Sequence, residues 1–274
     1  MPGTPPPPGM HRVALGIEYD GSAYCGWQRQ AHVASVQQAL EEALAWVADA
    51  PVSLICAGRT DAGVHACEQV AHFDTRAHRR PESWVRGANS ALDRAIALRW
   101  AQEMPGDFHA RFTARARTYR YVIANTRHRP ALAHRGLTWV PAPLDAAAMH
   151  RALKKLRGEH DYSSFRAAGC QSRSATRHLS HTAVTRHGER ILIELRANAF
   201  VLHMVRNIVG SLLDVGRGTA DESHLLRLLE LRDRTRAGPT APPTGLYLFK
   251  VSYPPHFTLP NLPPNPACPA TLGD

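Results

Sequence analysis

The segment AGRTDAGVH, residues 57–65, places a carboxylate, a guanidinium and an imidazole in one short connector between two apolar stretches. Asp61 is the group that could act there as a nucleophile or as a general base. The same residues also fit an ordinary β-turn, because Asp accepts backbone hydrogen bonds and Gly63 tolerates a positive φ. Arg59 favours a functional loop, since a simple turn has no need of a cation. The loop residues alone leave both interpretations open.

A second charged side chain stands out in the apolar stretch 200–215, which we predict to be a helix with Arg206 in its middle. An Arg at a domain rim can extend its head into solvent. A buried guanidinium, in contrast, needs a carboxylate partner or costs several kcal/mol in desolvation. Carboxylates are scarce in the connectors that could face this helix, and Asp61 is the candidate partner. Such a pair would keep Asp61 ionised, as a nucleophile requires.

The segment FTARARTYRYVI, residues 112–123, alternates arginines with Tyr119 and Tyr121. A solvated face of a β-sheet explains this pattern, and we prefer that interpretation for Tyr121. Aromatic rings beside cations are also suited to stacking on an unpaired base, which is how proteins grip single-stranded RNA. The segment therefore keeps a structural and an RNA-binding interpretation.

Hydrophobic periodicity predicts the elements that position these groups. In the first half we expect strands at 12–20, 52–58, 67–75 and 95–104, and helices at 35–47 and 80–92. This β-α-β-β-α-β order is that of a ferredoxin-like unit. In the second half we expect strands at 118–124 and 245–251, a hairpin at 182–195, and helices at 145–158, 200–215 and 221–231. The second half roughly repeats the first.

The predicted fold class is therefore α+β, with two ferredoxin-like (RRM-like) halves whose antiparallel sheets form a central cleft. We place the first domain at 11–110 and the second at 111–257. The Pro-rich segments 1–10 and 258–274 are predicted to be disordered tails.

Composition points to a partner of negative charge. The net charge is +10 and the isoelectric point about 9.9. Nearly all cations are Arg, the side chain that forks onto phosphates and stacks on bases, so nucleic acid is the leading partner class. The five cysteines are odd in number and show no C-x-x-C spacing, which argues against disulfides or a zinc site and fits a cytoplasmic location. No apolar run approaches a membrane span, and the first residues do not form a signal peptide.

Two histidines, His65 and His72, flank the strand that follows the loop. A zinc site would need further ligands nearby, so we interpret both as structural or RNA-contacting, with the structural role favoured. The segment YDGSAYCGWQ, residues 19–28, is expected to form a loop that touches RNA, although Asp20 and Gly21 equally suit a turn that ends a strand.

Several motifs occur together in a characteristic order: YDGSAYCGWQRQ, AGRTDAGVHA, FHARFTARARTYRYVI, FVLHMVRNIVGSLLDVG and GLYLFKV. In these motifs the chain resembles the TruA family of tRNA pseudouridine synthases, from about residue 13 to residue 253. The resemblance implies isomerisation of uridine to pseudouridine at positions 38, 39 and 40 of the tRNA anticodon arm. It also implies a homodimer without a cofactor, and we expect no metal and no membrane partner.

The resemblance further implies roles for particular residues. Asp61 matches the catalytic nucleophile, Arg206 the arginine that pairs with it, and Tyr119 the base-stacking tyrosine, which is also a candidate proton acceptor. Arg59 matches the loop arginine that helps to displace the target base. The expected substrate-binding residues are Tyr119, Leu246 beneath the uracil, His65 and Arg111.

The chemistry leaves alternatives open. A carboxylate could attack either C6 of uracil or C1′ of the ribose. A non-catalytic RNA-binding module is the main alternative function, because ferredoxin-like sheets often only bind. A hydrolase with Asp61 as general base is a third, but it should show a second carboxylate or a metal site near the loop.

Overall fold

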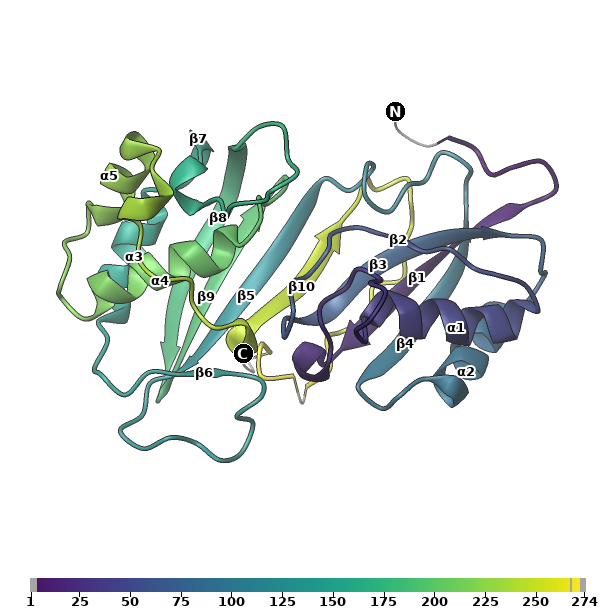
Figure 1. Ribbon diagram of the computed structural model, residues 1–274, viewed down its shortest axis with the longest axis horizontal. Helices are drawn as coiled ribbons and strands as arrows, with labels where there is room; N and C mark the ends of the chain where they lie inside the picture. The colour runs from purple at the N-terminus through teal and green to yellow at the C-terminus, as the bar shows by residue number, and fades with distance from the viewer. Residues whose placement is uncertain (1–3, 267, 272–274) are drawn as a thin grey trace. The chain divides into compact units, whose positions relative to one another are not determined.

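The computed structural model describes residues 4–266 and 268–271, which form two compact units (Figure 1). Unit 1 consists of Met1–Arg115 and Leu248–Asn265, and unit 2 of Ala116–Tyr247 and Pro266–Asp274. The first unit thus extends past the expected boundary at residue 110, and the chain returns to it near the C-terminus. The expected tails also include residues 1–3, 267 and 272–274, which lie outside the described residues.

Unit 1 has the predicted element order. Its elements are β1 (His11–Tyr19), α1 (Val36–Ala48), β2 (Ile55–Cys56), β3 (His65–Thr75), α2 (Pro81–Ala91) and β4 (Ile96–Met104). Strand β1 is antiparallel to both β3 and β4, and β2 pairs with the other edge of β3, which is the ferredoxin-like arrangement. Strand β2 is much shorter than predicted, because only Ile55 and Cys56 pair with β3. Both α1 and α2 lie on one face of this sheet (Figure 1).

Helix α1 forms for local reasons and fixes the chain that leads to the loop. Ser35 caps its N-terminus by accepting a hydrogen bond from the backbone N–H of Gln38. The helix ends at Ala48, one residue beyond the predicted end, where Asp49 adopts a left-handed conformation with φ of 53°. The buried carboxylate of Glu41 accepts the backbone N–H of Leu54 at 2.9 Å, which holds the segment just before β2 against the helix.

Unit 2 contains the elements predicted for the second half and two short strands that were not predicted. The elements are β5 (Ala116–Ala124), β6 (Thr138–Trp139), α3 (Ala146–Lys154), β7 (Gly158–Asp161), β8 (Thr176–His187), β9 (Arg190–Ala197), α4 (Met204–Gly216) and α5 (His224–Leu231). The sheet has the order β5-β9-β8-β7, with β6 parallel to β5. Asp145 caps the N-terminus of α3, and α3, α4 and α5 pack on one another (Figure 1).

The last strand, β10 (Leu246–Ser252), belongs to both units, with its first two residues in unit 2 and the others in unit 1. The segment after it is not loose where it is described. The side chains of Gln102 and Arg99 donate hydrogen bonds to the carbonyls of Thr258 and Pro263, at 3.0 and 2.9 Å. The expectation of a disordered segment from residue 258 is therefore corrected for this part, because the sheet strands of unit 1 supply donors for its proline-rich backbone.

Candidate active site

The candidate catalytic loop, residues 57–65, leaves β2 and enters β3 within unit 1. Asp61 opens a β-turn in which the backbone N–H of Val64 donates to the carbonyl of Asp61 at 3.1 Å, and Gly63 has φ of 75°. The turn interpretation is therefore confirmed as local structure. The turn alone does not explain why the loop carries two charged side chains, an exposed Arg59 and a half-buried Asp61.

The segment 19–28 holds this loop in place on both sides of Asp61. The hydroxyls of Tyr19 and Thr60 lie 2.7 Å apart in a buried hydrogen bond, and the backbone N–H of Trp27 donates to the carbonyl of Thr60 at 3.0 Å. Beyond the turn, the N–H of Gly63 donates to the carbonyl of Tyr24 at 3.2 Å. The carboxylate of Asp61 is thus presented from a backbone with little freedom to move.

Two glycines make this contact between the loops sterically possible. A Cβ on Gly21 would collide with the carbonyl of Val64, and a Cβ on Gly26 would lie 2.7 Å from the carbonyl of Thr60. Gly26 also has φ of 88°, a conformation that favours glycine. Sequence reasoning assigned this segment to RNA contact and missed its role as a support for the loop, although its glycines were visible in the motif.

Of the two roles considered for His65, structural support and RNA contact, the structure shows structural support. Its side chain is only 4% exposed, and its Nδ1 lies 3.1 Å from Oδ1 of Asp20 and 3.2 Å from the backbone nitrogen of Gly21. The hydrogen bond to His65 holds the pKa of Asp20 well below its usual range. Asp20 also caps the short 3-10 turn Gly21–Ala23, so Asp20 and Gly21 do form a turn that ends β1. Substrate contact by His65 stays a prediction.

His72 is also a structural residue. It is buried, and its Nδ1 accepts the backbone N–H of Ala110 at 3.2 Å. Burial lowers the pKa of His72 to about 3, so the ring is neutral. In the described part of the chain, no group of three or more His, Cys, Asp or Glu residues could hold a metal ion.

Arg59 and Arg111 both belong to unit 1. Both are exposed, and the charges of both act on the buried thiol of Cys56, whose pKa burial raises to about 12. The thiol is therefore protonated and unreactive at neutral pH, as expected for a small buried residue. The two guanidinium groups give the surface around the loop a positive potential that suits a phosphate chain.

Tyr119 and Tyr121 both lie on β5 in unit 2, and both are buried. The ring of Tyr119 meets Phe200 edge to face, with centroids 4.9 Å apart. The solvated position expected for Tyr121 is wrong. Its hydroxyl contacts that of Thr138 at 2.7 Å and donates to the carbonyl of Pro242 at 2.9 Å, and burial raises its pKa. Strand β6 and the chain before β10 cover this position, which an Arg-Tyr alternation could not reveal.

Arg206 lies in the first turn of α4 and not in the middle of a helix, because the helix begins at Met204 rather than at residue 200. Its side chain is half-buried, and its Nε donates to the carbonyl of Ala241 at 2.8 Å. The backbone N–H of Ala241 in turn donates to the carbonyl of Arg206 at 3.1 Å. These two hydrogen bonds hold the side chain of Arg206 in place at its Nε atom.

The chain from residue 239 to residue 246 connects the functional candidates of unit 2. Gly210 lets this chain approach α4, since a Cβ there would collide with the carbonyl of Pro239. The same chain accepts hydrogen bonds from Arg206 and from Tyr121, and it ends at the buried Leu246, the first residue of β10. The structure thus brings two of the expected site residues, Arg206 and Leu246, to one strip of unit 2, next to the structural Tyr121. Asp61 and Arg59 share the loop of unit 1.

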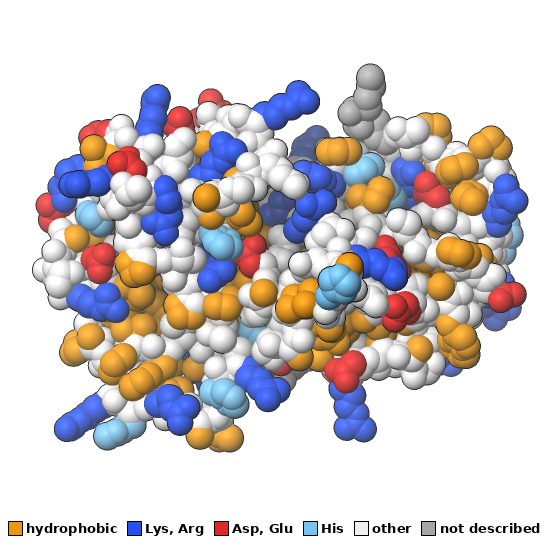
Figure 2. Space-filling model, viewed as in Figure 1, with side chains coloured by type: hydrophobic (Ala, Val, Ile, Leu, Met, Phe, Trp, Pro, Cys, Tyr) orange, Lys and Arg blue, Asp and Glu red, His pale blue; other side chains and the backbone are white. Residues whose placement is uncertain are grey.

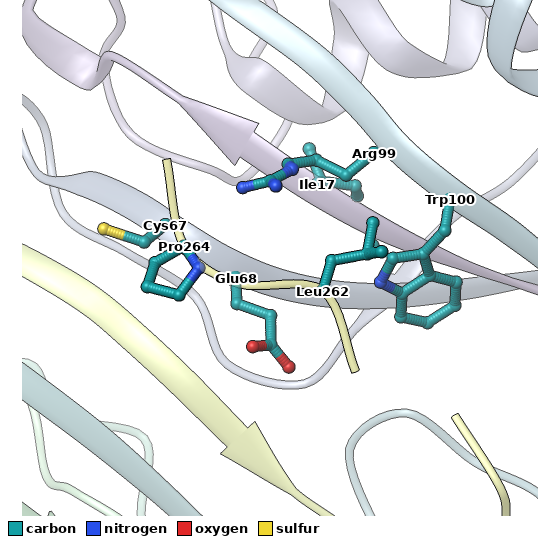
Figure 3. Close-up of a pocket in the computed structure, with 8 residues that line it drawn as sticks. Ile17, Cys67, Glu68, Arg99, Trp100, Leu262 and Pro264 are labelled. Atoms are coloured by element: carbon teal, nitrogen blue, oxygen red, sulfur yellow. The ribbon is translucent and has the colours of Figure 1, made fainter. Parts of the chain in front are cut away.

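A pocket lies on unit 1 beneath the C-terminal segment (Figure 3). Leu262 and Pro264 line it from that segment, together with Trp100 and Arg99 of β4 and Glu68 of β3. Burial raises the pKa of Glu68 to about 7, and the charges of Lys250 and Arg99 oppose this rise. The pocket contains none of the expected site residues, so we treat it as part of the packing of the C-terminal segment.

On the face shown in Figure 2, the side chains of Lys and Arg are spread over both units rather than gathered in one patch. The high positive charge therefore provides a general attraction for a polyanion, and specific recognition has to come from particular groups. None of the helices in residues 4–266 and 268–271 has the length and apolar character needed to cross a membrane.

Comparison with known proteins identifies the family. The family described as tRNA pseudouridine synthase matches residues 16–113 and 152–254. The chain is 55% identical to tRNA pseudouridine synthase A of Klebsiella pneumoniae over 93% of its own length and 94% of that protein. It is 55% identical to the protein of the same name from Yersinia pestis, over 93% and 97%, and 54% identical to that from Escherichia fergusonii, over 94% and 96%.

The chain therefore belongs to the tRNA pseudouridine synthase family. It is an isomerase that acts on uridine in tRNA, and the resemblance seen in the sequence motifs is confirmed.

The half-buried Glu68 gives a pH dependence of stability that a single substitution should remove. Its pKa is raised from 4.5 to about 7 in the folded state, so the folded protein binds more protons than the unfolded chain between these values. Wild-type stability should therefore fall, relative to Glu68→Gln, as pH rises from about 4.5 through 7, by on the order of 1–3 kcal/mol. Urea unfolding of both proteins from pH 4 to pH 8.5 measures this difference, and parallel stability curves would contradict it.

Proposed function

We propose that this enzyme forms pseudouridine at positions 38, 39 and 40 of the tRNA anticodon arm, with Asp61 as its nucleophile. The observation that carries the proposal is that hydrogen bonds from the segment 19–28 fix the loop on both sides of Asp61, at Thr60 and at Gly63. A binding loop could remain flexible, whereas a nucleophile has to be kept near its attack geometry. The exposed Arg59 of the same loop and the exposed Arg111 of the same unit suit the phosphates that flank a target nucleotide.

The reaction breaks the N1–C1′ bond of uridine, turns the base, and joins C1′ to C5. The carboxylate of Asp61 holds one fragment covalently during the rotation, through either C6 or C1′. The proton on C5 then leaves, N1 takes up a proton in place of its bond to C1′, and the nucleophile is released unchanged. No electrons are gained or lost overall, so the chain's own groups suffice and no cofactor is required.

We infer that Arg206 forms an ion pair with Asp61 and keeps its carboxylate ionised. Support comes from the firm attachment of Arg206 to Ala241, which presents the guanidinium from a rigid base. Tyr119 and Leu246 are proposed to contact the two faces of the uracil, since Tyr119 offers an aromatic ring and Leu246 an apolar surface. Arg59 is proposed to take the place of the displaced base.

The target uridine has to leave its stack before Asp61 can reach it, at a cost of a few kcal/mol. Contacts of Arg side chains with the phosphates of the anticodon arm offset this cost. We further propose that the protein acts as a cytoplasmic homodimer, as the resemblance to the TruA family implies, and that two copies bind the RNA together.

Replacing Asp61 by Asn should abolish pseudouridine formation, because the amide is a poor nucleophile of nearly the same shape. The affinity for unmodified tRNA should change by less than about tenfold, or 1.4 kcal/mol. Sequencing-based mapping of pseudouridine in the anticodon arm, with tRNA binding measured in parallel, tests both statements. Appreciable turnover by Asp61→Asn would remove the nucleophile, and modification outside positions 38–40 would remove the proposed target.

The Tyr119→Phe substitution separates stacking from hydroxyl chemistry. If the phenol accepts the C5 proton, the rate of a single turnover should fall by about 100-fold or more, while tRNA affinity is kept by the ring. Replacing Tyr119 by Leu should weaken both. A Phe variant with nearly wild-type single-turnover rates would exclude the hydroxyl as the proton acceptor and leave only the stacking role.

A further inference from the structure

We propose that His109, Arg111 and Phe112 form a platform on which an unpaired nucleotide of the tRNA stacks beside the catalytic loop. The inference rests on the proposed function, because it takes the substrate to be tRNA. It adds Phe112 and His109 as substrate-binding groups, and it gives Arg111 a particular partner, the ring of Phe112.

Phe112 is an aromatic ring on the surface of unit 1, with 58% of its area exposed. The ring of His109 stacks on it, with centroids 4.3 Å apart and planes 27° apart. The guanidinium carbon of Arg111 lies 5.6 Å from the centroid of Phe112. More than half of the surface of Phe112 as a residue still faces solvent, so these two neighbours leave room for another planar group.

The turn that carries the platform is held by its own hydrogen bonds. The backbone N–H groups of Arg111 and Phe112 both donate to Nδ1 of His109, each at 3.1 Å. The backbone N–H of Thr113 donates to the carbonyl of His109 at 3.0 Å. Since Nδ1 accepts both bonds, the His109 ring is neutral with its proton on Nε2, and burial and the charge of Arg12 lower its pKa further.

The other side chains of this turn anchor it in the core of unit 1. Phe108 is fully buried and meets Phe257 edge to face, with centroids 5.2 Å apart. The hydroxyl of Tyr253 donates to the carbonyl of Ala110 at 2.6 Å, and the backbone N–H of Ala110 donates to His72. A ring fixed in this way loses little conformational freedom when a ligand stacks on it, which favours binding.

The platform lies next to the strand that leads into the catalytic loop. His72, which receives the N–H of Ala110, pairs with Ile55 of β2 across the sheet. Cys56 follows Ile55 and lies within the field of both Arg111 and Arg59. A nucleotide on Phe112 would therefore be near the chain entering the loop that carries Asp61.

The chemistry of the platform fits a nucleotide better than an apolar peptide. A stacked ring offers a π face that any base can cover, and a guanidinium beside it attracts either the base or a phosphate. A protein partner would instead favour a wider apolar patch around Phe112. The immediate neighbours here are an imidazole and a guanidinium, which points to RNA.

Three variants test the platform on the full-length protein. Phe112→Ala should raise the Kd for unmodified tRNA by roughly 5- to 100-fold, whereas Phe112→Tyr, which keeps the ring, should stay within about twofold of wild type. Trp46→Ala is the control, because Trp46 is an aromatic residue of α1 that is 69% exposed. Its Kd should equal that of wild type.

The salt dependence of binding separates the ring from the cation. Loss of Phe112 removes no charge, so the slope of log Kd against log salt should be unchanged. Arg111→Ala should lower this slope by about one, as expected for the loss of one phosphate contact. An unchanged Kd of Phe112→Ala for tRNA would overturn the platform. If this variant also showed an altered sedimentation coefficient, Phe112 would instead be a contact between protein chains.

Wild-type activity keeps this inference distinct from the proposed function. If wild type modifies positions 38–40 and Phe112→Ala binds tRNA normally, the platform is wrong and the function stands. If wild type forms no pseudouridine at these positions but Phe112→Ala still loses tRNA affinity, the function is wrong and the platform stands.

Discussion

The close backbone contact between the segment 19–28 and the loop 57–65 is the constraint on which the position of Asp61 depends. Gly21 and Gly26 have no side chains to separate the two segments, so the carbonyls of Val64 and Thr60 can approach them. The Tyr19–Thr60 hydrogen bond and the buried His65 then lock the contact. A reactive carboxylate needs such a rigid base, because misplacement by about 1 Å at a reacting centre can cost 100-fold in rate.

Unit 2 uses an analogous device for its own functional candidates. The chain before β10 lies against α4 at Gly210 and against β5 at Gly245, whose Cβ would lie 2.5 Å from the carbonyl of Val122. Its carbonyls accept hydrogen bonds from Arg206 and Tyr121. In both units, the supporting segments approach through glycine and offer backbone carbonyls as hydrogen-bond acceptors.

The predictable part of the structure was the part determined locally. The β-α-β-β-α-β order, the Ser35 and Asp145 caps and the turn at Asp61 follow from periodicity and from side chains a few residues apart. The errors involve contacts distant in sequence. Tyr121 is covered by Thr138 and Pro242, and the segment after β10 accepts hydrogen bonds from side chains of β4. The late start of α4 follows from His203, whose left-handed φ of 59° no propensity predicts. The motif order, in contrast, identified the family correctly.

Single-turnover pseudouridine formation by Arg206→Leu tests most directly whether Asp61 depends on a cationic partner. The Leu variant should be much slower than wild type, because the guanidinium proposed to hold the carboxylate in place is lost. Arg206→Lys should recover part of the loss, since it restores the charge without the fork. A wild-type rate for the Leu variant would contradict the pairing.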